Sequence, residues 1–108
     1  MTNQWEIFFQ EIVDDVGELI KDEVREMLDS ARNDSDKFLK HQAEKVEKYL
    51  NQLAMGEINK RQLEGYLRDI IALTEMYVLQ LSVAARARAQ RLTLGISNLI
   101  VKRLLALI

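Results

Sequence analysis

The chain has 108 residues, of which 48% are hydrophobic and 30% charged, with four glycines, no proline and no cysteine. The length fits one globular domain, and the absence of cysteine excludes disulfides, thiolate metal sites and thiol nucleophiles. A formal net charge of -2 gives no reason to expect a nucleic-acid partner, because nucleic-acid-binding domains are usually basic. Sheets and loop-rich folds need frequent turn residues, so the scarcity of glycine and proline predicts an all-α protein with long helices.

The first arm of the predicted fold is a long helix over residues 4–55. Asn3, with Glu6 three residues later, is a weak form of an N-terminal capping box. The polar cluster at residues 30–36 is the one candidate break in this arm. No Ser or Asp in the cluster is followed by Glu or Gln at the third position, so we expect the helix to run through it. A break there is the alternative.

The turn between the arms is expected at residues 56–59. Gly56 suits the left-handed position that follows a helix end, and Asn59 with Gln62 matches a capping box. The second arm then covers residues 60–108, in which Gly95 is a weak point. Residues 1–108 are thus predicted to form a single domain, a long antiparallel αα-hairpin whose arms are each about 75 Å long.

Apolar positions along both arms recur with the spacings 3, 4 and 4, which is an eleven-residue (hendecad) repeat. This repeat predicts a coiled coil of nearly straight helices. Placing Met55 opposite Lys60 brings three pairs together: Tyr49 with Tyr66, Phe38 with Tyr77, and Val16 with Leu99. The polar residues on these stripes, Gln42, Thr74 and Arg88, are expected to fix the register.

Charge is divided between the two ends of the chain. Residues 1–36 contain 11 acidic and 3 basic side chains, whereas residues 76–108 contain 5 basic and none acidic. The hairpin places these segments side by side, so their attraction is expected to select antiparallel alignment. The residues assigned to this charge register are Arg86, Arg88, Arg91, Asp22, Glu23, Glu26 and Asp29. The alternative is that the three arginines bind an anionic partner.

The second arm has more apolar surface than one hairpin seam can cover. In a projection of residues 83–108 at 100° per residue, one apolar stripe faces the first arm and a second points elsewhere. The second stripe consists of Val83, Ala87, Leu94, Val101 and Leu105. Two stripes indicate two partners, so we expect a homo-oligomer, most simply a two-fold dimer that forms a four-helix bundle.

The open end of the hairpin is expected to gather large apolar side chains. They are Trp5, Phe8, Phe9, Leu104, Leu107 and Ile108. Such a cluster is either the end of the oligomer core or a docking surface for a protein partner or a membrane. The turn end, ringed by charged side chains, is expected to be solvated.

No residue pattern in the chain predicts catalysis, a cofactor or a metal site. The single histidine, His41, is not part of a Glu-x-x-His motif, and no Ser or Thr pairs with it at a useful spacing. Asp14 and Asp15 are adjacent, so on a helix they diverge by about 100° and are expected on a solvated face.

These features predict a non-enzymatic, self-associating interaction or assembly protein. The alternative is a peripheral protein that binds lipid or another apolar surface through amphipathic helices. Residues 1–18 contain no Lys or Arg, which argues against a secretory signal and predicts a cytoplasmic location. No stretch reaches about 18 uncharged apolar residues, so we expect no spanning helix.

Overall fold

The computed structural model describes residues 3–12 and 14–108, and all regular structure within these ranges is helical. The five α-helices are α1 (Gln4–Ile12), α2 (Asp15–Arg32), α3 (Lys37–Ala54), α4 (Lys60–Tyr77) and α5 (Val83–Gly95). A 3₁₀ turn, η1 (Val78–Gln80), separates α4 from α5. Helix α5 continues into the π-helical segment η2 (Ile96–Leu104) and the 3₁₀ turn η3 (Leu105–Leu107). The prediction of an all-α protein is confirmed.

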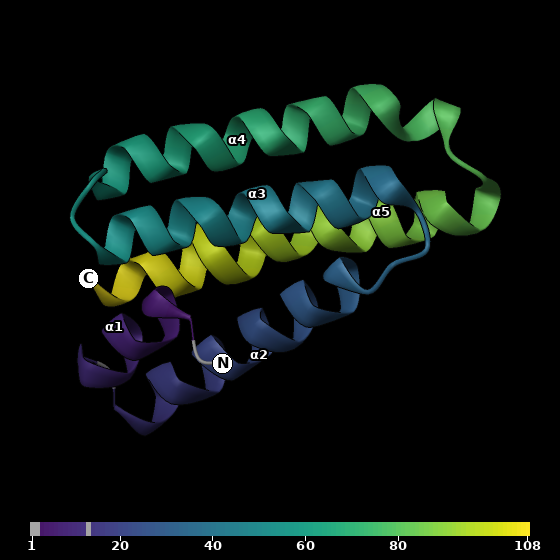
Figure 1. Cartoon of the computed structure of the whole chain (residues 1–108). Coiled ribbons are helices and arrows are strands. Elements are labelled where there is room, and N and C mark those ends of the chain that lie inside the picture. The colour runs from purple at the N-terminus through teal and green to yellow at the C-terminus, as the bar shows by residue number, and fades with distance from the viewer. Residues whose placement is uncertain (1–2, 13) are drawn as a thin grey trace.

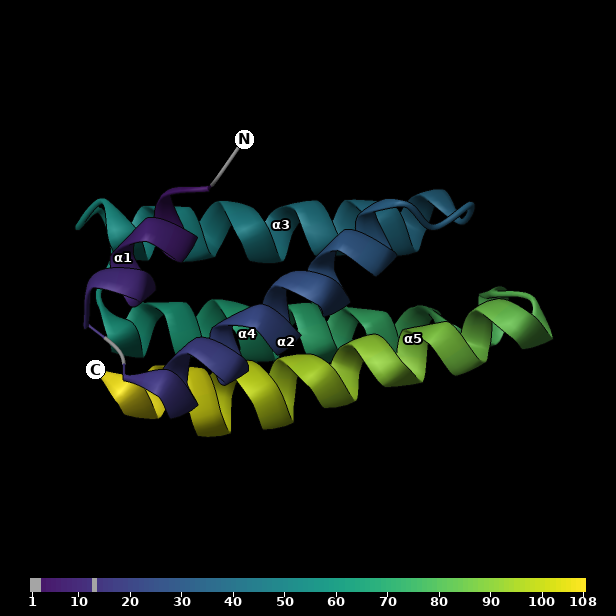
Figure 2. The same cartoon turned by 90° about the horizontal axis from the view of Figure 1, so that it is seen from below.

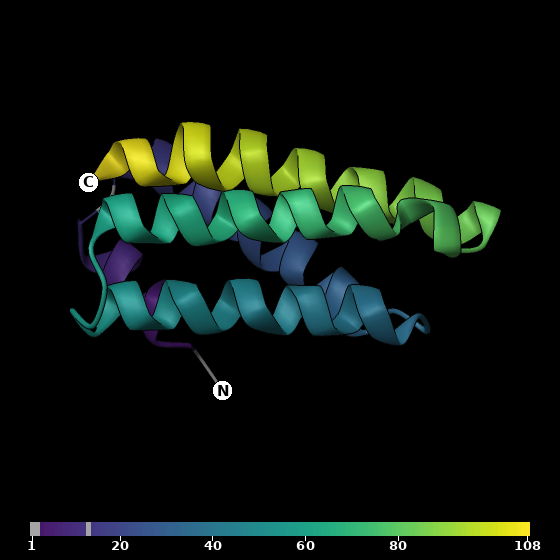
Figure 3. The same ribbon diagram turned by 90° about the horizontal axis from the view of Figure 1, so that it is seen from above.

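Helices α2, α3, α4 and the α5–η2 helix form a four-helix arrangement within one chain (Figure 1). Helix α2 packs on α3 and η2, α3 packs on α4, and α4 packs on α5 and η2. Seen from below, α2 crosses the other helices diagonally, while the view from above shows α3, α4 and α5 side by side (Figures 2 and 3). Helix α1 lies across one end, against α2 and α3. A bundle that we expected from two chains is therefore built by one.

The predicted long hairpin is wrong. Its arms would be about 75 Å long, whereas the molecule measures 40 × 24 × 23 Å. The first arm is broken at residues 33–36, where we expected a continuous helix, and the second at residues 78–82, where we expected no break. A further break separates α1 from α2. Each arm therefore folds back on itself.

Aspartate side chains cause the break at residues 33–36. The Asp36 carboxylate accepts hydrogen bonds from the backbone N–H groups of Phe38 and Leu39, at 3.0 and 3.1 Å. Asp34 accepts another from the N–H of Asp36 at 2.8 Å. These bonds satisfy free donors at the start of α3 without the Glu or Gln of a capping box. The absence of a capping-box pattern in residues 30–36 therefore did not indicate a continuous helix.

The other two breaks also precede a capping side chain. Ser82 Oγ accepts a hydrogen bond from the Ala85 N–H at 3.2 Å and so begins α5. Asp14, which we expected on a solvated helix face, accepts one from the Gly17 N–H at 3.0 Å and begins α2. In all three cases a short polar side chain satisfies the first donors of the next helix.

The turn between α3 and α4 matches its prediction. Gly56 has a φ of +75°, in the region that favours glycine. The Asn59 side chain accepts a hydrogen bond from the Gln62 N–H at 2.8 Å, and the Gln62 side chain accepts one from the Asn59 N–H at 2.9 Å. This reciprocal pair confirms the capping box.

The predicted register holds for the inner hairpin of α3 and α4. Tyr49 stacks on Tyr66 with ring centroids 4.8 Å apart, and Phe38 stacks on Tyr77 at 4.3 Å. Val16, which the same register placed opposite Leu99, is exposed near the start of α2. The break at residues 33–36 explains the difference, because residues before it no longer follow the line of α3.

A buried polar pair joins α3 to α4 within the core. Gln42 is fully buried, and its Nε2 donates to Thr74 Oγ1 at 3.0 Å and to the Ile70 carbonyl at 3.4 Å. Thr74 Oγ1 donates to the same carbonyl at 2.8 Å. Other pairings of the two helices would leave Gln42 Nε2 without these acceptors in an apolar core, so this contact favours the observed register.

Helix α2 approaches the α5–η2 helix closely at Gly95. A Cβ atom at this position would overlap the sulfur of Met27. The methionine side chain therefore occupies the space that any larger residue at position 95 would need, and it fills the gap between the two helices.

Replacing Thr74 with Val should destabilise the fold by about 1–3 kcal/mol, because the buried Gln42 amide loses its best acceptor. The double variant Gln42→Leu/Thr74→Val should recover much of this loss, since both polar partners are then removed together. Urea unfolding followed by circular dichroism measures both. Thr93→Val is the matched control, because the Thr93 hydroxyl bonds only locally, to the Gln90 carbonyl. Equal stability of the Thr74 variant and the wild type would contradict this role.

Candidate functional site

The predicted oligomer stripe is divided between surface and core. Val83 and Leu94 are 79% and 60% exposed, and Ala87 is also exposed. Leu105 is buried, and Val101 packs partly buried against the core. The projection assumed α-helical geometry throughout, but η2 is π-helical, and wider turns shift later residues around the axis. The surface part of the stripe is therefore Val83, Ala87 and Leu94.

The predicted open tip lies largely inside the core of this chain. Trp5, Phe9 and Leu104 are fully buried, Phe8 and Leu107 are partly buried, and Ile108 remains 40% exposed. Helix α1 covers this end of the bundle. The tip was predicted at the end of the molecule that is distant from the turn. It lies beside the turn instead, because Lys60 Nζ donates to the Ile108 carbonyl at 3.4 Å. Folding back of both arms brings the two predicted ends together (Figure 1).

The three arginines of the charge register have three different environments. Arg88 binds Asp34, with Nε–Oδ2 and Nη2–Oδ1 distances of 2.6 and 3.1 Å. Arg86 donates to two backbone carbonyls before α5, those of Leu79 and Leu81, each at 3.2 Å. Within residues 3–12 and 14–108, no carboxylate lies at ion-pair distance from Arg91.

The acidic residues of the charge register also have partners other than those predicted. Glu23 pairs with Arg103 at 3.3 Å, while Asp22 and Asp29 pair with basic residues of α2 itself. No ion pair of Glu26 is found among the described residues. Acidic α2 does lie beside basic η2, so the charge pattern predicted neighbouring segments but not individual pairs.

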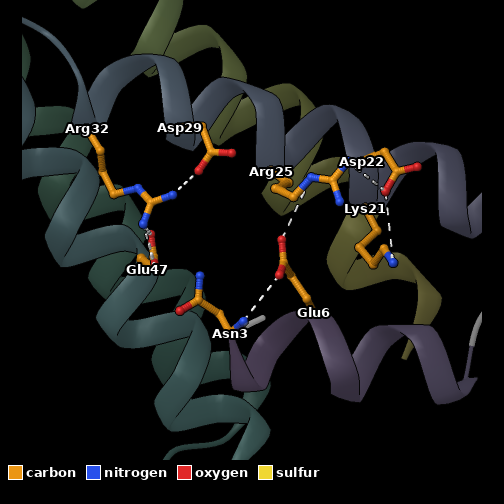
Figure 4. Close-up of polar contacts among 8 residues, drawn as sticks. All are labelled: Asn3, Glu6, Lys21, Asp22, Arg25, Asp29, Arg32 and Glu47. Atoms are coloured by element: carbon orange, nitrogen blue, oxygen red, sulfur yellow. Dashed lines mark hydrogen bonds and ion pairs between the residues drawn. The ribbon is translucent and has the colours of Figure 1, made fainter. Parts of the chain in front are cut away.

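Polar side chains also connect α1, α2 and α3 (Figure 4). Arg32 of α2 contacts Asp29 on its own helix and Glu47 of α3, the latter at 3.1 Å. Glu6 of α1 accepts from the Asn3 N–H at 3.2 Å and lies 3.9 Å from Arg25 of α2. The Glu6–Arg25 pair thus links α1 to α2, and the Arg32–Glu47 pair links α2 to α3.

The ion pair of Asp34 and Arg88 fixes the charge of both groups. The hydrogen bond from Arg88 lowers the pKa of Asp34 below its usual value of 3.8, against the opposing effect of burial. The same bond raises the pKa of Arg88. The Asp34 side chain is only 6% exposed, and the pair links the loop before α3 to helix α5.

Helices α4 and α5 and the 3₁₀ turn η1 between them expose large apolar side chains. Met76 and Leu79 are 75% and 77% exposed, close in sequence to Val83. Two hollows of about 340 and 400 Å³ lie between the helices, and Glu75, Thr93 and Leu94 line both. We call this surface the α4–α5 face.

No further chemistry is evident in the part of the chain that the structure describes. It contains no group of three or more His, Cys, Asp or Glu side chains placed to hold a metal ion. None of its helices is both long enough and apolar enough to cross a membrane. Comparisons with protein-family models, curated proteins and solved structures give no match. Function must therefore be inferred from surfaces and hollows.

Replacing Asp34 with Asn should lower the melting temperature at pH 7 by a few degrees. The folded-state pKa of Asp34 is depressed, so its contribution is complete above the usual value of 3.8 and disappears as pH falls through the folded-state pKa. The difference from wild type should thus be constant between about pH 5 and 8 and vanish in stronger acid. Thermal denaturation across pH measures this. Glu26→Gln, on the exposed side of α2, is the matched control, because Glu26 has no ion pair among the described residues.

Proposed function

We propose that the chain is a non-enzymatic interaction protein that self-associates through the α4–α5 face. The observation that carries this proposal is the exposure of Met76 at the end of α4, Leu79 in η1, and Val83 and Leu94 on α5. Much of the apolar excess of the second arm is covered within the chain, but these side chains are not. Large exposed apolar patches on soluble domains mark interaction sites.

A second copy of the chain has a suitable shape for this face. Leu94 is 60% exposed and borders both hollows, so the face offers a projecting side chain next to open space. A two-fold interface requires one surface to complement itself, with a projection from each copy entering a hollow of the other. Ala72 and Ser97, which line the second hollow, leave room for such a side chain.

The size of the face agrees with a dimer interface. The molecule measures 40 × 24 × 23 Å, and α4 and α5 run along its long axis (Figure 3). One long side of this outline is of the order needed by a standard interface, which buries ~800 Å² per partner. A second copy can cover the patch without any rearrangement of the bundle.

Charge favours the pairing of α4 in one copy with α5 in the other. Asp69 and Glu75 of α4 have no ion-pair partner among the described residues. The ionisable side chains of α5 and η2 are all basic, and Lys102 likewise has no partner among the described residues. An antiparallel arrangement can bring Asp69 and Glu75 of one copy close to Lys102 of the other, which favours this orientation.

A lipid surface is the weaker candidate for an apolar partner. A second group of exposed apolar residues, Ile12, Val16 and Leu19, lies near acidic Glu11 and Glu18. Helices that bind anionic membranes carry Lys and Arg beside their apolar face. An acidic border repels such membranes, so no observation at this corner supports lipid binding.

Replacing Leu94 with Glu should convert the dimer to a monomer at micromolar concentration. A buried, unpaired carboxylate at the interface costs several kcal/mol, which is a loss of affinity of at least a hundredfold. Chromatography with light scattering measures the mass. Leu19→Glu is the matched control, because Leu19 is 65% exposed on α2, away from the face, and this variant should remain dimeric.

Two outcomes would contradict the proposal. A wild-type mass of 12.6 kDa throughout the micromolar range would show that the face does not pair with a second copy. Co-sedimentation of wild type with phosphatidylcholine vesicles, abolished by Leu94→Glu, would assign the face to lipid instead.

A further inference from the structure

A separate pocket of about 260 Å³ lies where α2, the start of α3 and α5 meet. Its apolar lining comes from Met27 and Ala31 of α2, Leu39 of α3 and Leu92 of α5. Leu39 and Leu92 are almost fully buried, so they form a fixed floor. The polar residues of the lining are Ser30, Asp34, Arg88 and Arg91.

The charges of this pocket leave one cation available. Asp34 and Arg88 form a two-bond ion pair, and these two charges compensate each other. Arg91 has no carboxylate within ion-pair distance among the described residues, although acidic residues are numerous in α2. A guanidinium beside an apolar floor can bind a carboxylate through two parallel hydrogen bonds.

We propose that this pocket binds a small aliphatic monocarboxylate. The carboxylate pairs with Arg91, and the hydrocarbon chain lies on Leu39 and Leu92. The pocket is slightly smaller than the ~300–1,000 Å³ typical of drug-sized ligands, which restricts the guest to a short chain. The ionised Asp34 disfavours a guest of higher negative charge, because part of any added charge would face that carboxylate.

The pocket is independent of the proposed dimer interface. It is lined by Arg88, Arg91 and Leu92, whereas the hollows of the α4–α5 face are lined by Gln90, Thr93 and Leu94. Adjacent positions on a helix differ in direction by about 100°, so these two sets point to different sides of α5. Ligand binding can therefore be tested whether or not the chain forms a dimer.

The test is a titration of the wild-type chain with sodium hexanoate, monitored by amide chemical shifts in ¹H–¹⁵N spectra. Hexanoate should produce saturable shifts at Ala31, Leu39 and Leu92. Hexanol has the same chain without the charge, and acetate has the charge without the chain. Both should bind at least about tenfold more weakly, because each lacks one of the two contacts. Hexylamine, with the opposite charge, should not bind.

Two variants locate the contacts. Arg91→Gln should weaken hexanoate binding at least about tenfold with little effect on folding, because Arg91 is exposed. Its matched control is Arg61→Gln, which removes one exposed guanidinium of α4 outside the pocket and should bind as wild type does. Ala31→Leu fills the pocket from α2 and should abolish binding while Arg91 is retained. Circular dichroism confirms that each variant is folded.

The proposal is overturned if Arg91→Gln binds hexanoate as tightly as wild type. Equal affinity for acetate and hexanoate would show a surface anion site without use of the apolar floor, and would overturn it too. Saturable shifts confined to Thr93, Leu94 and Ser97 would place the ligand in the α4–α5 face and would likewise exclude this pocket.

Discussion

The fold depends on two helix breaks that lie at nearly equal distances from the Gly56 turn. Helices α3 and α4 between these breaks have 18 residues each, or about 27 Å. Because both arms end at the same level, α2 and α5 can return along the inner hairpin and cover it. A continuous hairpin would bury one seam and need a second chain for the rest. Here Asp36 and Ser82 end the arms early, and one chain supplies all four helices.

The features that the sequence predicted well depend on residues close to the turn. Gly56 and the box of Asn59 and Gln62 act locally, and the pairing of Tyr49 with Tyr66 and of Phe38 with Tyr77 follows once the turn is placed. Breaks at Asp36 and Ser82 were harder to predict, because a cap contributes only about 1 kcal/mol. Packing between helices that are far apart in sequence then decides whether the chain continues or turns.

The candidate sites show the same dependence on long-range structure. Val83 and Leu94 of the predicted stripe do lie at the surface, but Leu105 is in the core because π-helical turns change the direction of later side chains. The pocket beside Arg91 could not be predicted, since it exists only where the break at residues 33–36 brings Asp34 to Arg88. Sequence periodicity therefore identified exposed apolar residues, whereas the hollows required the folded arrangement.

Because α2 and the α5–η2 helix approach closely at Gly95, side chains at positions 27 and 95 compete for the same space. A Cβ at position 95 is tolerable only where a shorter or displaced side chain stands at position 27, so the sizes of the two residues must change in opposite directions. Met27 also lines the pocket beside Arg91. An exchange of bulk between these positions would therefore alter the depth of the pocket while leaving its charged groups in place. The sizes of residues 27 and 95 would therefore influence the chain length of carboxylate that the proposed site accepts, although Gly95 is not part of its lining.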